Sequence, residues 1–174
     1  SDVEDLKKKL DELLEEVERT SREVRKTSER SLEEVEKLLR RVKEESKRLL
    51  EEVERDIKDE SIIDEVRRLV ERSEENLREI LRRITKVVED TERRLKESLD
   101  EAREVVERVR DLLERNVDVK KVLDDVKKLV DDVKRKDKKL LDDDRRRVEE
   151  ALEHIKRNLD RSRDLIRRIK EKAK

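Results

Sequence analysis

The chain has 174 residues, of which 59% are charged and 31% hydrophobic, and 51 Lys and Arg balance 52 Asp and Glu to a net charge of −1. It contains no Gly, Pro, Cys, Met, Phe, Tyr or Trp, which excludes disulfides and thiolate metal sites, glycine-rich phosphate loops and aromatic platforms for stacking bases. No apolar run approaches the ~18–20 residues of a membrane span and no signal-peptide core occurs, so we expect a soluble protein.

The first third of the chain has the apolar spacing of an amphipathic helix. Ser1-Asp2-Val3-Glu4 has the sequence of a capping box, so this helix is predicted over about 2–58. Its apolar positions are Val3, Leu6, Leu10, Leu13, Leu14, Val17, Val24, Leu32, Val35, Leu39, Val42, Leu50, Val53 and Ile57.

The pattern repeats after 18 residues: LLEEVER at 13–19 returns as SLEEVEK at 31–37 and as LLEEVER at 49–55. Eighteen residues are five turns of 3.6, whereas a seven-residue repeat would impose a left-handed supercoil. Nearly straight helices are therefore expected.

The second helix is predicted over about 61–115. KDES at 58–61 offers Asp59 or Ser61 as its N-cap, and Asp64 follows Ser61 by three residues, the spacing of a capping box. Ile62, Ile80 and Ser98 continue the 18-residue repeat.

The third helix is predicted over about 118–172, after the interruption RNVDVKK at 115–121. Asn116 suits the left-handed position that ends a helix, and Asp118 suits the next N-cap. Val117 lies five residues before Val122, the spacing of a hydrophobic staple.

A rival break lies at 140–150, where Asp143 or Asp144 would cap a fourth helix. The repeat from Val130 to Val148 to Ile166 passes through this stretch without a shift in phase, which favours one continuous helix.

Each predicted helix has about 55 residues and a length of ~80 Å. Short connections make successive helices antiparallel. The fold class is therefore all-α: one elongated, single-chain antiparallel three-helix bundle, with 1–174 as one domain.

Folding the chain about its two connections places residues in layers, and apolar residues meet apolar residues in most of them, as in Leu39, Ile80 and Ile155. The polar residues that interrupt the apolar stripes also meet one another, in three layers: Ser21 with Ser98 and Asp137; Ser28 with Thr91 and Asp144; Ser46 with Ser73 and Ser162.

In the two layers with a carboxylate, two hydroxyls can donate hydrogen bonds to Asp137 or Asp144. Such layers would satisfy their own polar groups and would penalise shifted alignments, in which a carboxylate faces leucine. Thr20, Thr27, Ser31, Asn76 and Asn158 flank the layers as possible extensions, and the two asparagines fall at nearly the same height.

This combination of straight repeated helices, capping sequences and matched polar layers resembles that of de novo designed helical bundles, over the whole chain. The resemblance implies a structural protein or scaffold with no natural biochemical function and no natural location, expressed recombinantly in the cytoplasm. The alternative is an interaction module, either a designed binder or a subunit of a helical assembly.

His154, the only histidine, could be imagined in a triad with Ser28 and Asp144. It lies ten residues from Asp144 on one helix, roughly 15 Å away, so the geometry of a triad fails. We expect a histidine at the boundary of the core, at most joined to a polar layer.

Asp137 and Asp144 are two turns apart, roughly 10 Å, too far to share a metal ion, and Glu150 and His154 form only a surface pair. KRKDKK at 134–139 is basic, but DDD follows at 142–144, so a solvated face of mixed charge is expected rather than a nucleic-acid site. The sequence predicts no catalytic residue, cofactor or metal ligand.

An interaction module would expose an apolar anchor patch. The residues that widen the apolar stripes of the first two helices are explained more simply as contacts between helices: Leu13, Leu38, Leu49, Ile63, Leu81 and Leu99. We expect a monomer with no required partner, no nucleic acid and no membrane contact; self-association stays the alternative.

Overall fold

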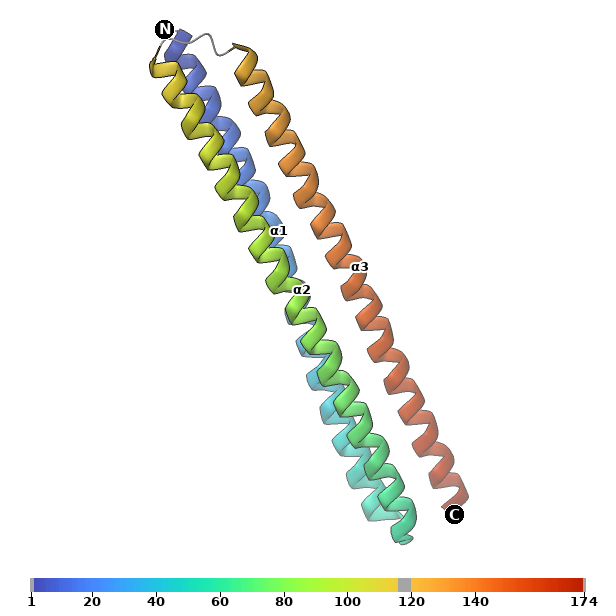
Figure 1. Cartoon of the computed structure of the whole chain (residues 1–174). Helices are drawn as coiled ribbons and strands as arrows, with labels where there is room; N and C mark the ends of the chain where they lie inside the picture. The colour runs from blue at the N-terminus through green and yellow to red at the C-terminus, as the bar shows by residue number, and fades with distance from the viewer. Residues whose placement is uncertain (1, 116–119, 174) are drawn as a thin grey trace. The chain divides into compact units, whose positions relative to one another are not determined.

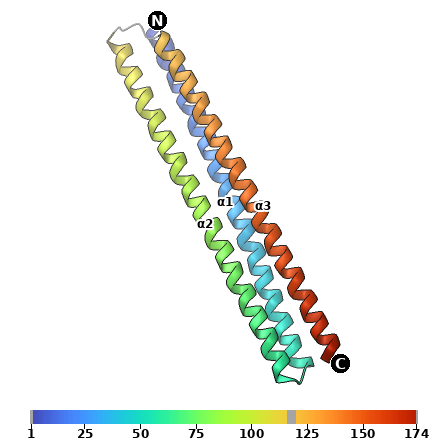
Figure 2. The same ribbon diagram turned by 45° about the vertical axis from the view of Figure 1, so that its right-hand side comes forward.

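The computed structural model describes residues 2–115 and 120–173, which form three α-helices. α1 spans Asp2–Asp56, α2 spans Glu60–Glu114 and α3 spans Lys120–Ala173. Figures 1 and 2 show that α2 runs antiparallel to α1 and α3. The predicted all-α three-helix bundle is confirmed, and α3 runs through 140–150 without the rival break.

The connection between α1 and α2 is one residue longer than predicted: α1 ends at Asp56, two residues early, and α2 begins at Glu60, one residue early. Of the two candidate caps, Asp59 fills the role. Its Oδ1 accepts hydrogen bonds from the Ser61 amide at 3.0 Å and from the Ser61 hydroxyl at 2.7 Å. These bonds lower the pKa of the Asp59 carboxyl and satisfy an amide that has no partner inside the helix.

The other predicted caps fall largely on residues that the structure does not describe. Ser1 of the first capping box, and Asn116, Val117 and Asp118 before α3, lie outside the described residues.

The chain divides into two compact units. Unit 1 comprises residues 1–29 and 87–145, and unit 2 comprises residues 30–86 and 146–174. Each unit contains part of every helix, and we describe each by itself.

The core of unit 1 is purely aliphatic outside its polar layers, and all three helices contribute to it. Its buried members are Leu10, Val17, Ala102, Val106, Val109, Leu113, Leu123, Val126, Val130 and Val133. Because these residues recur at helical spacing, each helix buries one stripe and leaves the opposite face to solvent.

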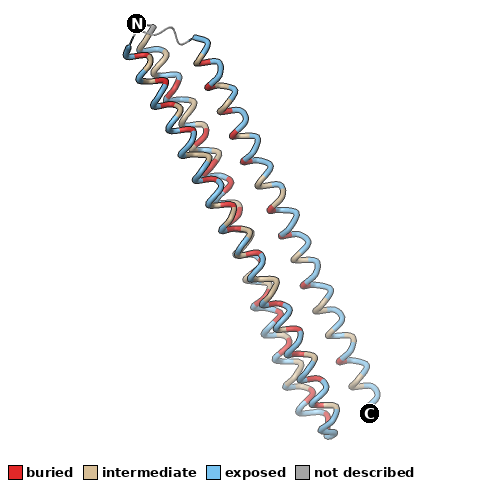
Figure 3. The backbone as a smooth tube through the Cα atoms, in the orientation of Figure 1, coloured by how far each residue is buried: buried red, intermediate tan, exposed pale blue. Residues whose placement is uncertain are grey.

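Unit 2 has two buried clusters. One is built around Val35, Val42, Leu77 and Ile155, and the other around Val53, Val66, Val70 and Ile166. Figure 3 shows buried positions alternating with exposed ones along every helix. Leu165 of α3 is the large hydrophobic residue that stands out from this pattern, with 40% of its surface exposed.

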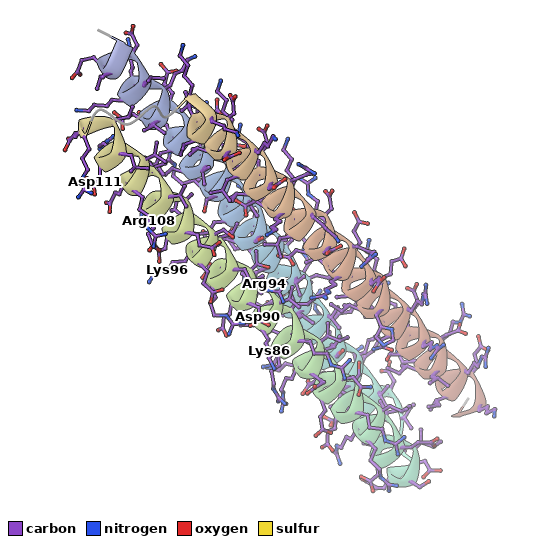
Figure 4. The ribbon with its side chains drawn as sticks, turned by 45° about the horizontal axis from the view of Figure 1, so that its top comes forward. Lys86, Asp90, Arg94, Lys96, Arg108 and Asp111 are labelled. Carbon is purple, nitrogen blue, oxygen red and sulfur yellow. The ribbon has the colours of Figure 1, made fainter. Side chains whose placement is uncertain are left out.

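The outer faces carry mixed charge, as the sequence predicted. Figure 4 shows Lys96 and Arg108 of α2 projecting away from the neighbouring helices of unit 1. Many ion pairs on these faces are spaced three or four residues apart in one helix, such as Arg108 with Glu104 at 2.6 Å. Exposed pairs of this kind each contribute little to stability.

A second set of ion pairs links different helices. In unit 1, Glu16 of α1 pairs with Lys134 of α3 and Glu18 of α1 pairs with Arg103 of α2. In unit 2, Glu52 of α1 pairs with Lys170 of α3 at 2.6 Å. These pairs lie at the edges of the buried stripes and leave the centres of the layers to aliphatic side chains and to the residues of the polar layers.

Candidate functional site

One polar layer in the core of unit 1 joins all three helices through a single carboxylate. Ser28 of α1 donates a hydrogen bond to Oδ2 of Asp144 at 3.3 Å, and Thr91 of α2 donates to the same oxygen at 2.6 Å. The three residues are 1%, 2% and 5% exposed. Hydrogen bonds to a buried carboxylate are among the stronger ones in proteins, so this layer fixes the height of α3 against the other two helices.

The neighbouring layer, seven residues away along α3, differs from what the sequence predicted. Asp137 is 1% exposed, and its Oδ1 has no hydrogen-bond partner. Ser21 is buried and Ser98 is half-buried. Their hydroxyls donate no hydrogen bond to Oδ1 that would offset the cost of removing the carboxylate from water. Burial alone raises the pKa of Asp137 to about 6.

The third layer lies in unit 2 and contains hydroxyls only. Ser46 and Ser73 are buried, whereas Ser162 is half-buried. The Ser73 hydroxyl oxygen is enclosed and has no partner. Without a carboxylate as a common acceptor, this layer lacks the anchor that Asp144 provides in unit 1.

The flanking hydroxyls do not all point toward the layers. Thr20 and Thr27 donate to the backbone carbonyls of Glu16 and Glu23, each at 2.9 Å. This bond to the fourth preceding residue is the common fallback of Ser and Thr inside helices. Ser31 is half-buried and also has an interaction partner.

The predicted pair of asparagines is not formed through the Asn158 amide. Asn76 is exposed, while Nδ2 of Asn158 is buried and has no partner. His154 is exposed on α3 in unit 2, farther from the core than the boundary position that its place on the apolar stripe indicated.

Among the described residues, no group of three or more His, Cys, Asp or Glu side chains is placed to hold a metal ion. Nor does any helix in 2–115 or 120–173 combine the length and apolar character needed to cross a membrane.

Sequence reasoning missed a surface groove between α1 and α2 in unit 2. Leu39, Leu77 and Leu81 form its apolar floor, and the groove encloses about 310 Å³. Its rim is charged and consists of Glu36, Arg40, Lys43, Glu74 and Arg78. The signal available in the sequence was Leu81, which widens the apolar stripe of α2.

In comparisons with known proteins, no protein-family model, curated protein or solved structure matches the chain.

Proposed function

We propose that this chain is a de novo designed helical bundle whose role is structural: a scaffold in which buried polar layers specify one alignment of the three helices. The observation that carries the proposal is the convergence of Ser28 and Thr91 on one oxygen of Asp144, at 3.3 and 2.6 Å. Each of the three helices supplies one member of this layer.

The physical argument concerns what a shifted alignment would cost. Aliphatic layers of Leu, Ile and Val tolerate many pairings because hydrophobic burial is not directional. A buried carboxylate that loses its donors pays its full desolvation cost, which is several times the net gain of an ordinary hydrogen bond. The layer therefore acts less by stabilising the native alignment than by destabilising the others.

The proposal assigns no catalytic role to the chain. Ser28 and Thr91 carry hydroxyls, which act as nucleophiles in some enzymes, but both residues are buried and their hydroxyl protons are directed at Asp144. The single imidazole, on His154, is exposed in unit 2. A substrate would have no access to these hydroxyls without opening the core.

Two variants test the structural role. Asp144→Leu removes the common acceptor and should destabilise the protein by about 1–3 kcal/mol. The triple variant Ser28→Val, Thr91→Val, Asp144→Leu should be as stable as the parent or more so, but should form oligomers or alternative packings. Denaturant unfolding and solution mass by light scattering measure both effects.

The all-hydroxyl layer of unit 2 provides a matched control. Replacing Ser46 and Ser73 with Val and Ser162 with Leu should leave the protein monomeric, because no carboxylate is lost. If the Asp144 triple variant is much less stable than the parent and still monomeric, the layer is not a specificity device.

The groove of unit 2 favours a second candidate, an interaction module. Its apolar floor of Leu39, Leu77 and Leu81 between charged rims has the form of a site for an amphipathic helix. Leu81→Glu would place a charge on that floor. If the parent associates in a concentration-dependent manner and Leu81→Glu does not, this candidate is supported. A parent that stays monomeric at millimolar concentration would reject self-association through the groove.

A further inference from the structure

Asp137 and Asp144 are two carboxylates at equivalent positions on α3 in unit 1, with different surroundings. Asp144 receives two hydroxyl protons on Oδ2. Asp137 is 1% exposed and its Oδ1 receives none. A buried carboxylate without donors must either take up a proton or be reached by water.

We propose that Asp137 makes the surrounding segment of α3, residues 133–141, a proton-controlled joint, meaning a segment that opens and closes locally. With the carboxylate ionised, the segment opens to hydrate the charge. Uptake of a proton from solvent holds it closed against α1 and α2. This inference goes beyond the structural role proposed above, since it concerns a motion and the signal that controls it. It requires no group other than a proton, which binds a carboxylate oxygen and leaves a neutral carboxyl able to donate one hydrogen bond.

The charged groups of α1 near this position do not neutralise Asp137. Ser21 lies at its height, and the charged residues one turn away are Glu18 and Arg25. Glu18 pairs with Arg103 at 3.4 Å, and Arg25 pairs with Glu29 at 3.4 Å.

The same holds for α2 and for α3 itself. Ser98 lies at the height of Asp137 on α2, and the charged residues one turn away, Arg94 and Glu101, are exposed. Lys134, one turn before Asp137 on α3, pairs with Glu16. Consistent with this geometry, the pKa of Asp137 is raised by burial, with no charged neighbour contributing.

The sign of the effect follows from linkage. The pKa of Asp137 rises from an ordinary 3.8 to about 6 in the closed state, so the closed state binds the proton more tightly than the open one. Closure is therefore strongest below pH 3.8 and weakens as the pH rises through 6. The equilibrium constant for opening should increase about 60-fold between pH 4 and pH 8.

Amide hydrogen exchange on the full chain, corrected for intrinsic exchange rates, tests the inference at residues 133–141. The expected result is a loss of protection of about 60-fold from pH 4 to pH 8, with little change at amides near Ile155 in unit 2. Equal loss in both units would show global unfolding and would overturn the local joint, and so would protection that does not change with pH.

Two variants assign the effect to one carboxyl. Asp137→Asn should abolish the pH dependence at 133–141, whereas Asp144→Asn, which keeps an acceptor for Ser28 and Thr91, should retain it. Should Asp137→Asn fail to fold, the carboxyl-carbon NMR titration of the parent decides: a midpoint near 6 supports the joint, and one below 4.5 refutes it.

Discussion

The two donors to Asp144 should contribute unequally to stability, because their hydrogen bonds differ in length. Thr91 lies 2.6 Å from Oδ2 and Ser28 lies 3.3 Å from it. Thr91→Val keeps the shape of the side chain and removes only the hydroxyl. A short bond to a buried charged group is worth about 1.5–3 kcal/mol, so this variant should lose an amount in that range.

Ser28→Ala removes the longer bond and should cost about 0.5–1.5 kcal/mol. Denaturant unfolding followed by far-ultraviolet circular dichroism gives both values from the same chain. A Ser28→Ala variant that is destabilised as much as Thr91→Val, or more, would refute the ranking by distance.

The double variant extends the test. With both donors removed, the burial of Asp144 is no longer offset by these two hydroxyl hydrogen bonds, so the pKa of its carboxyl should be higher than in the parent. A carboxyl whose pKa is raised in the folded state stabilises the fold below its unfolded pKa, and this contribution is lost as the pH rises through the folded value. The double variant should therefore lose more stability than the parent between pH 4 and pH 8, and an unchanged pH profile would contradict the reasoning.

Three further outcomes are expected. Leu10→Ala, at a side chain with 0% exposure, should lower the free energy of unfolding by about 2–5 kcal/mol. Leu165→Ala, at 40% exposure, should lower it by less than about 1.5 kcal/mol. Equal losses would contradict the assigned cores. Asn158→Leu should stabilise the protein in denaturant unfolding by about 1 kcal/mol, because its buried Nδ2 has no partner and an unpaired buried group is costly. Asp59→Ala should speed hydrogen exchange at the Ser61 amide, which loses its acceptor. In the parent, the protection of this amide should be lost as the pH falls through the lowered pKa of the Asp59 carboxyl.

The fold was predictable because apolar spacing alone determines where the helices run. Val17, Val35 and Val53 are each 0% exposed, and all three lie on the 18-residue repeat read from the sequence. The start of α2 was less predictable, since both Asp59 and Ser61 are good capping residues. Only the geometry of the turn selects Asp59.

The polar layers were predictable in position but not in hydrogen bonding. Position follows from the period of the helix, whereas the direction of a hydroxyl depends on a choice among side-chain rotamers. Thr27 uses its hydroxyl on its own helix, while Ser28, the next residue, donates across to α3. Asp137 and Asp144 look alike in the sequence, and only the packed side chains distinguish them.

The 18-residue repeat means that α3 could slide by one full repeat and still bury an aliphatic stripe. Ser162 lies 18 residues after Asp144, and Ile155 lies 18 residues after Asp137. After such a slide Asp144 would meet the hydroxyls of Ser46 and Ser73, a tolerable exchange of one layer for another. Asp137 would meet Leu39 and Ile80, with no polar group beside it. In the native core Asp137 lies at the height of two serines, and this slide would replace both with aliphatic side chains. Against a slide of one full repeat it is therefore Asp137 that distinguishes the native position of α3, whereas the Asp144 layer opposes shorter slides, which would place Asp144 among aliphatic side chains.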